Sequence, residues 1–350
     1  MSTRWIYGLG AAVIACSGSS TEPDSNNNPP GSTKTNVAGR TDRTITVDGQ
    51  QREFVVYVGS TVGATAAVPV VFMYHGTSGD GPQFFQQSGW REKADVEGLI
   101  AVFPSGLTYC HYKDDNRDGD FSDPGERNVS TKWAAGELGT PAMPLCTAQD
   151  LATLSAQNRA LADHPLRDDV AFVDAMISFL KQNYVIDDKA IYSTGFSNGA
   201  EFSNRLAVER NNVFAATAAH AGGLVVTPNP GRAMSAVFSG GASDPNVCAV
   251  LGVTAIPISA NTLNNFPLLM GQIQPLLQQL RLTQSYTYSE PVINGKRVGR
   301  WTFSTSTAGA TNSLTFNLLE DNLHAYPNGT GHPIVMANML WPFFKAQRLP

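Results

Sequence analysis

The sequence has no excess of positive charge, no long hydrophobic run and no visible internal repeat. Its net charge of −5 gives no reason to expect a nucleic-acid partner. The apolar run at residues 6–15 is too short to span a bilayer. What is present is an ordinary globular composition: 350 residues, 42% hydrophobic and 15% charged, are enough to bury a sizeable core. We expect a monomer.

The first residues have the pattern of an export signal, because Arg4 precedes the apolar run and small residues follow it. The letters VIAC, ending at Cys16, resemble the lipobox of bacterial lipoproteins, in which the cysteine becomes a lipidated N-terminus. An ordinary secretory signal with an incidental cysteine is the alternative. Residues 17–40 are rich in Ser, Asn, Pro, Gly and Thr and predict a disordered tether. The predicted organisation is a signal peptide at 1–16, the tether, and one domain at 41–350. The protein is then secreted or anchored at the bacterial surface, with membrane contact only through Cys16.

Cysteines are scarce, and with Cys16 set aside an odd number remains. Export permits disulfides. Cys110 and Cys146 bracket one insertion, residues 109–150, and are the favoured pair. Cys248 is then a buried thiol or an alternative partner.

Alternating and β-branched segments indicate strands, and apolar residues at helical spacing indicate helices. An antiparallel hairpin is expected at Arg43–Val47 and Glu53–Val58, with Asp48-Gly49 as its turn. Further strands are expected at Val68–Tyr74, Leu99–Phe103, Phe214–Ala219, Ala233–Phe238 and Leu314–Leu318, and helices at Gln83–Glu97 and Asp169–Tyr184. Strands that alternate with helices predict an α/β fold with a mainly parallel sheet covered on both faces.

The pentapeptide Gly195-Phe196-Ser197-Asn198-Gly199 has the G-x-S-x-G pattern of a nucleophile elbow. It follows a predicted strand at Ile191–Thr194 and precedes a predicted helix at Glu201–Arg210. A serine in such a tight turn projects its hydroxyl, and the helix N-terminus favours developing negative charge. Ser197 is therefore the candidate nucleophile, although an ordinary strand-turn-helix could carry the same letters.

Hydrolases with such an elbow carry their catalytic residues in the order Ser, acid, His. Asp244 follows the strand after the elbow and is the candidate acid. Only His324 and His332 lie further along the chain. We prefer His324, which lies in a loop at a strand end, over His332, which is expected to open the final helical segment. His220 precedes the acid and is assigned a structural role.

The turn at His75-Gly76-Thr77 follows a buried strand and can supply a backbone amide to an oxyanion. We favour the Thr77 amide over that of Gly76, acting together with the amide of Asn198. His75 is either near the substrate or a structural hydrogen-bonding residue, and the structural interpretation is preferred.

Residues 114–126 place carboxylate or amide oxygens at alternate positions, a pattern that suits Ca²⁺. The candidate ligands are Asp114, Asn116, Asp118, Asp120 and Glu126, with Asp123 less well placed. The spacing begins like an EF-hand loop, but the final glutamate comes one residue late. A solvated acidic loop is the alternative. Any Ca²⁺ is expected to have a structural role, and no cofactor is expected for catalysis.

Six ordered segments together resemble the extracellular poly(3-hydroxybutyrate) depolymerase and feruloyl esterase family of α/β-hydrolase carboxylesterases. They are Tyr74-His75-Gly76, Phe103-Pro104-Ser105-Gly106, Asp168 to Val173, the elbow, Ser243-Asp244-Pro245 and His324-Ala325-Tyr326-Pro327. The resemblance extends from about Thr41 to the C-terminus. It implies an α/β-hydrolase fold and a Ser197–Asp244–His324 triad that hydrolyses esters of a polyester or of a feruloylated or acetylated polysaccharide.

The chain departs from the family pattern around its histidine, where family members commonly have a glycine-rich run before it and a tryptophan after it. Here Glu320-Asp321-Asn322-Leu323 precede His324, and Tyr326 follows. Trp133 resembles the tryptophan of the family's Trp-Asn-x-Gly segment, and is expected either to line the cleft or to be a core residue. His75, Gly76, Trp133 and Tyr326 are the predicted substrate-binding residues. A non-catalytic surface protein and a serine peptidase remain the alternative functions.

Overall fold

The computed structural model of the chain describes residues 34–114, 118–121, 123, 125–304 and 312–350. The expected signal peptide, Cys16 and the candidate ligand Asn116 lie outside these ranges. No helix in the described ranges is long and apolar enough to cross a membrane. Asn36 is buried, and its side chain accepts a hydrogen bond from the Val185 amide at 2.9 Å. The folded part therefore begins before Thr41.

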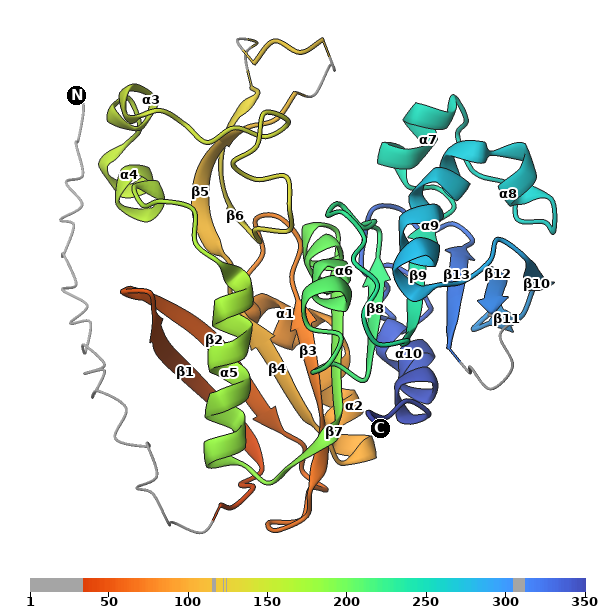
Figure 1. Cartoon of the computed structure of the whole chain (residues 1–350), viewed down its shortest axis with the longest axis horizontal. Helices are drawn as coiled ribbons and strands as arrows, with labels where there is room; N and C mark the ends of the chain where they lie inside the picture. The colour runs from red at the N-terminus through yellow and green to blue at the C-terminus, as the bar shows by residue number, and fades with distance from the viewer. Residues whose placement is uncertain (1–33, 115–117, 122, 124, 305–311) are drawn as a thin grey trace, which may run out of the picture.

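A single large sheet forms the centre of the described structure (Figure 1). Its order is β1-β2-β4-β3-β7-β8-β9-β13-β12-β10, with β11 paired to β12. The strands from β4 to β13 in this order run parallel, and antiparallel strands flank them on both sides. The strands are β1 Gly39–Val47, β2 Gln50–Val58, β3 Val68–Tyr74, β4 Ile100–Pro104, β7 Ile186–Phe196, β8 Ala216–His220, β9 Ser235–Gly241, β10 Tyr286–Ser289, β11 Val292–Ile293, β12 Lys296–Ser304 and β13 Ser313–Leu319.

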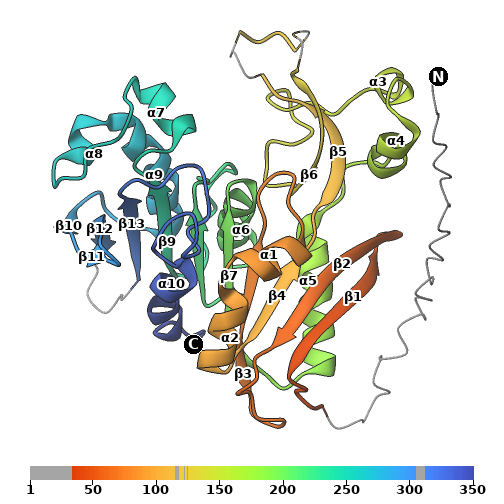
Figure 2. The same ribbon diagram turned by 180° about the vertical axis from the view of Figure 1, so that it is seen from behind.

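Helices cover both faces of this sheet (Figures 1 and 2). On one face lie α5 Asp169–Asn183, α6 Asn198–Glu209 and α9 Pro267–Leu280, and on the other lie α1 Gly81–Gln87, α2 Trp90–Glu97 and α10 Met336–Lys345. The short helices α7 Pro245–Leu251 and α8 Thr262–Asn265 follow β9. Strand β3 shows why this arrangement is stable, because its side chains are buried in alternation on the two faces: Phe72 packs toward α6, and Val71 and Met73 toward α10. The predicted parallel sheet and the hairpin of β1 and β2 are confirmed.

The prediction of one helix at Gln83–Glu97 is wrong, because two helices occupy this segment. Helix α1 ends at Gln87, and Gly89 has a φ of +75°, a left-handed conformation that interrupts the helical path. Helix α2 then begins at Trp90, which is fully buried beneath α10 and stacks near Phe344. The chain turns here because both helices must place their apolar faces on the same side of the sheet.

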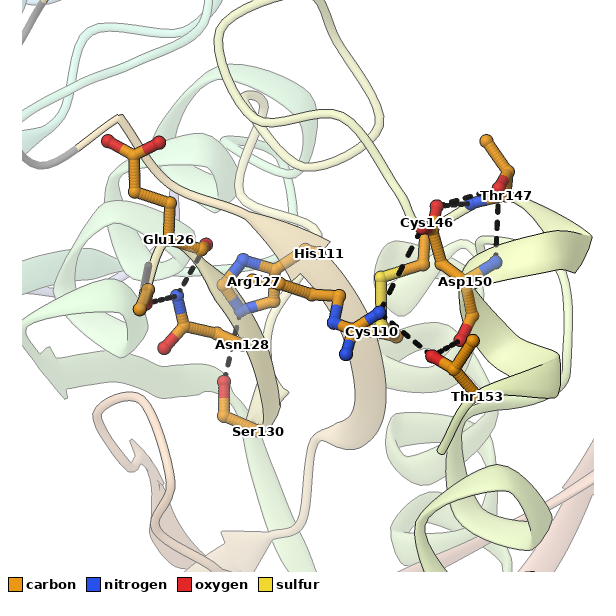
Figure 3. The surroundings of a disulfide bond; sticks show 11 residues. Cys110, His111, Glu126, Arg127, Asn128, Ser130, Cys146, Thr147, Asp150 and Thr153 are labelled. Atoms are coloured by element: carbon orange, nitrogen blue, oxygen red, sulfur yellow. Dashed lines mark hydrogen bonds and ion pairs between the residues drawn. A yellow bond between two sulfur atoms is a disulfide. The ribbon is translucent and has the colours of Figure 1, made fainter. Parts of the chain in front are cut away.

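The insertion leaves the sheet at the carboxyl end of β4 and projects beyond it (Figure 1). It contains the antiparallel pair β5 Leu107–Tyr112 and β6 Arg127–Lys132, followed by α3 Ala148–Ala152 and α4 Ala156–Ala162. A disulfide joins Cys110 to Cys146 with a Cα–Cα distance of 5.3 Å (Figure 3), which confirms the favoured pair. Cys248 is free and buried.

Candidate active site

Ser197 lies in the turn between β7 and α6, with φ 51° and ψ −123°. A serine rarely adopts a positive φ, so the surrounding contacts must hold this turn in place. The two glycines of the pentapeptide allow the required close packing. A Cβ on Gly195 would lie 2.1 Å from the Gly199 carbonyl oxygen, and a Cβ on Gly199 would lie 2.3 Å from that of His75. Both glycines are therefore needed for helix α6 to approach the strands, as a nucleophile elbow requires.

The three predicted triad side chains meet beyond the carboxyl ends of the parallel strands. His324 Nε2 lies 2.9 Å from Ser197 Oγ, and His324 Nδ1 lies 2.8 Å from Asp244 Oδ2. Residues 127 and 80 positions apart in the chain are thus joined in one line of hydrogen bonds. Asp244 begins the turn after β9, and His324 lies in the loop after β13, as predicted.

Asp244 is suited to hold a histidine because it is buried yet remains ionised. Burial opposes its charge, but the hydrogen bonds from His324 and from the Asn246 amide at 2.9 Å outweigh that effect and lower the pKa of Asp244. A carboxylate held in this way accepts the Nδ1 proton of the imidazole and leaves Nε2 free to accept the serine proton.

A second histidine holds the loop that carries His324. His220 Nε2 lies 3.1 Å from Asn322 Oδ1 and 3.2 Å from the Ala325 carbonyl oxygen, so a proton on Nε2 can be donated to both. Burial lowers the pKa of His220 to about 4, so it is neutral at physiological pH. Its carbonyl oxygen also accepts the Ser197 amide at 2.9 Å. His220 therefore has the structural role assigned to it, whereas Asn322 was noted only as a departure from the family pattern.

The two predicted oxyanion amides belong to residues in segments that adjoin the serine. The Asn198 amide begins helix α6, and Thr77 follows Gly76, whose Cβ position lies 3.2 Å from Ser197 Cβ. A side chain at position 76 would press on the serine, so the glycine lets this turn come close. Thr77 is exposed to solvent, which leaves the site accessible. The assignment of the Thr77 and Asn198 amides stays a prediction.

Trp133, one of the predicted substrate-binding side chains, is structural instead. Trp133 is fully buried, its indole donates to the His75 carbonyl oxygen at 2.9 Å, and its ring stacks on Phe202 with centroids 5.2 Å apart. Its amide donates a hydrogen bond to Asn198 Oδ1 at 2.7 Å, so Trp133 supports the elbow from the protein interior. The expectation that Trp133 lines the cleft is therefore corrected.

His75 is likewise buried and engaged at both ring nitrogens. Nε2 accepts the Gly106 amide at 2.8 Å, and Nδ1 donates to the Gly76 carbonyl oxygen at 2.7 Å. Burial lowers the pKa of His75 to about 4, which keeps Nε2 unprotonated and able to accept. His75 therefore joins two strand ends and has no polar atom left for substrate, in agreement with the preferred structural interpretation.

Tyr326 is half-buried behind the catalytic histidine. Its hydroxyl accepts the Trp90 indole N–H at 3.2 Å, and burial raises its pKa. The ring packs near Phe196 and Phe84 with centroids 6.2 Å away in each case. Its hydroxyl is therefore hydrogen-bonded inside the protein, and Tyr326 supports the loop of His324.

His332 is buried and takes no part in the triad, because its Nε2 is hydrogen-bonded to the Glu320 carbonyl oxygen at 2.8 Å.

A buried ion pair beneath the site was not anticipated. Arg52 on β2 and Asp169 on α5 are 2.6 Å apart, with side-chain exposures of 1% and 0%. The other oxygen of Asp169 accepts the Ala134 amide at 2.7 Å. Ala134 directly follows Trp133, so the pair fixes the segment that holds the elbow. The sequence carried only the Asp168-Asp169 letters as a signal, and nothing in it pointed to Arg52.

Where the structure describes it, the acidic loop has local hydrogen bonds but no cluster of metal ligands. Asp114 accepts the amides of Asp118 at 3.2 Å and Gly119 at 2.9 Å, and Asp118 accepts that of Asp120 at 2.8 Å. Glu126 is buried at the start of the β6 side of the hairpin. In the described ranges, no three acidic, histidine or cysteine side chains are grouped closely enough to hold a metal ion. Asn116 lies outside those ranges, so Ca²⁺ binding stays a prediction.

Calcium binding by this loop has a thermal signature. Excess EGTA is expected to lower Tm, and 2 mM CaCl₂, an amount of about 100 times a micromolar-range Kd, is expected to restore it by mass action. The Asp114→Asn variant is expected to lose that response. Equal Tm values with chelator and with calcium would assign the loop to the solvated alternative.

The elbow, the order Ser, Asp, His along the chain and the strand order place this protein in the α/β-hydrolase fold. Neither a scan against protein-family models nor a search of curated proteins finds a match. Among solved structures, an acetyl xylan esterase from Aspergillus awamori has a TM-score of 0.51 and 13% identity, covering 87% of this chain and 99% of that one.

Two further solved structures have lower TM-scores. An S-formylglutathione hydrolase from Agrobacterium tumefaciens has a TM-score of 0.49 and 13% identity, covering 91% of this chain and 99% of that one. A CE1 ferulic acid esterase from Anaeromyces mucronatus has a TM-score of 0.44 and 12% identity, covering 93% and 95%. At these identities the similarity concerns the fold alone.

Proposed function

We propose that this protein is a serine carboxylesterase. The observation that carries the proposal is the line of hydrogen bonds from Ser197 through His324 to Asp244, with the serine in an elbow. A serine hydroxyl is a weak nucleophile unless an adjacent base takes its proton, and here the base and the group that orients it are both in place.

The reaction follows from this geometry. His324 Nε2 accepts the Ser197 proton as Oγ attacks the ester carbonyl carbon, and Asp244 stabilises the imidazolium that forms. The amides of Thr77 and Asn198 are proposed to bind the oxyanion of the tetrahedral intermediate. His324 then gives its proton to the leaving alcohol, and the acyl group stays on Ser197. Water, activated by the same histidine, releases the acid and restores the serine.

For the substrate we propose a polyester of the poly(3-hydroxybutyrate) type or a feruloylated or acetylated polysaccharide. The motif resemblance supports this range, and the acetyl xylan esterase that shares the fold acts on one of these classes. Trp133 is buried, so it offers no aromatic wall to a feruloyl group. For this reason we propose that aliphatic esters, namely acetylated sugars and 3-hydroxybutyrate oligomers, are preferred over feruloyl esters.

A panel of esters tests this proposal and ranks the substrates. We expect hydrolysis of p-nitrophenyl acetate, p-nitrophenyl butyrate, acetylated xylan and a 3-hydroxybutyrate trimer, and a lower kcat/KM for methyl ferulate. A casein digest serves as the control for the peptidase alternative. Peptide cleavage without ester cleavage would overturn the proposal, and inactivity on every substrate would favour the non-catalytic surface protein.

We further propose that the protein is exported, as a released protein or as a lipoprotein anchored through Cys16. The disulfide between Cys110 and Cys146 supports export, because disulfides persist mainly in oxidising compartments. In bacterial cells, a Cys16→Ser variant of the lipoprotein is expected to move from the membrane fraction to the soluble fraction, whereas a released protein is soluble with either residue.

A further inference from the structure

Lys132, at the end of β6, is a buried cation that the proposed reaction does not use. The residue is only 6% exposed. Its ammonium donates a hydrogen bond to Thr77 Oγ1 at 3.4 Å, and no other described group lies within hydrogen-bond or ion-pair distance of it. An ammonium has three protons to donate, so most of its donor capacity is unused. Burying a charge with so few partners costs free energy.

The surroundings of Lys132 act on its charge in opposite directions. Burial lowers its pKa, while the negative charges of Glu201 on α6 and Glu137 in the insertion raise it. Glu201, which has the larger of these two effects, also accepts a hydrogen bond from the Asn198 side-chain amide at 3.1 Å. The lysine therefore presents positive charge toward Thr77.

The positive charge of Lys132 acts on Thr77. Its backbone amide is one of the two proposed oxyanion donors, and its hydroxyl, on the same residue, contacts the ammonium. The neighbouring Gly76 lies against Ser197. The charge of Lys132 thus contacts the residue whose amide is proposed to bind the ester oxygen as it becomes negative.

The residues on either side of Lys132 hold the same two turns. The Thr131 carbonyl oxygen accepts the Ser78 amide at 3.0 Å, and its hydroxyl donates to the Gly79 carbonyl oxygen at 2.6 Å. Trp133 bonds to Asn198. Residues 131–133, at the end of β6, therefore help to position both proposed oxyanion amides. This part of β6 belongs to the β5–β6 hairpin, in which Cys110 forms the disulfide (Figure 3).

We propose that Lys132 is a positioning residue of the oxyanion site, which orients Thr77 and places a positive charge beside the developing oxyanion. The proposal rests on the esterase function proposed above. It predicts a charge-dependent contribution to kcat that is independent of any charge on the substrate. A lysine that recognised a carboxylate of the substrate would instead affect KM, and only for anionic esters.

The test compares Lys132→Met, Lys132→Arg and the exposed control Lys189→Met. On the neutral ester p-nitrophenyl butyrate, Lys132→Met is expected to lower kcat by about 10- to 100-fold with little change in KM. Lys132→Arg keeps the charge and is expected to recover part of the loss, and Lys189→Met is expected to match the wild type. Binding of a boronic acid, which forms a tetrahedral anion on the serine, is expected to weaken by a similar factor in Lys132→Met.

Two results would overturn the inference: an unchanged kcat of Lys132→Met on the neutral ester, or a loss confined to a 3-hydroxybutyrate dimer with a free carboxylate. Should Lys132→Met fail to fold, Thr77→Val decides, because it removes the hydroxyl at an exposed position and keeps the amide. A lowered kcat of Thr77→Val supports the inference, and an unchanged kcat contradicts it. An inactive wild type would refute the proposed function itself, which separates the two failures.

Discussion

Replacing Ser197 with alanine is expected to lower kcat for ester hydrolysis by about 10⁴- to 10⁶-fold. The variant removes the only atom that forms the acyl-enzyme, while His324 and Asp244 remain hydrogen-bonded to each other. Tm is expected to change little, because the substitution removes only a hydroxyl that is hydrogen-bonded to His324. Initial rates on p-nitrophenyl butyrate and thermal melts of both proteins measure the two effects.

The matched control is Ser60→Ala, which changes an exposed serine far from the elbow in the chain. It is expected to keep wild-type kcat. If Ser197→Ala kept more than about one hundredth of the wild-type rate, far above the residual activity of enzymes that lack their nucleophile, the elbow assignment would be wrong.

The second large effect concerns stability. Asp169→Ala is expected to lower the free energy of unfolding by about 3–5 kcal/mol, because it leaves the Arg52 guanidinium buried and without its partner. The Ala134 amide would lose its acceptor as well. Urea unfolding followed by fluorescence measures the change. The exposed pair of Lys181 and Asp188 supplies the control, and Asp188→Asn is expected to change stability by about 1 kcal/mol or less.

The double variant Arg52→Met with Asp169→Leu makes this prediction specific. Removing both charges is expected to recover most of the stability lost in Asp169→Ala, because no unpaired ion remains buried. The Ala134 amide stays without its acceptor, so the recovery of stability is incomplete. An Asp169→Ala variant as stable as the wild type would show that the buried pair contributes little to stability.

Local signals in the sequence predicted the parts of the fold that depend on neighbouring residues. The turn at Asp48-Gly49 joins β1 to β2 with φ values of +50° and +77°, which is the left-handed pair that such a hairpin requires. Ser197 was found from its flanking glycines, and Asp244 and His324 from their order and from their places after strands. The turn and the serine were predicted from signals within a few residues, whereas the acid and the histidine also required the order of residues along the chain.

Contacts between distant segments were not predictable in the same way. Arg52 and Asp169 are 117 positions apart, and His220 and Asn322 are 102 apart, so no periodicity in the chain connects them. Trp133 shows the same limit, because the sequence around it is consistent with either a cleft wall or a core residue. Only its packing against Phe202 and the elbow shows that it is a core residue. Burial of a polar or aromatic group depends on which elements meet.

Covalent labelling tests the central claim most directly. The protein is incubated with a fluorophosphonate, digested, and the modified peptide identified by mass spectrometry, with His324→Ala as a parallel sample. We predict one adduct, on Ser197, formed quickly by the wild type and at least about 100-fold more slowly without the histidine that activates the serine. A folded wild type that gives no adduct, or an adduct on another residue, would contradict the assignment of Ser197 as the nucleophile of a serine esterase.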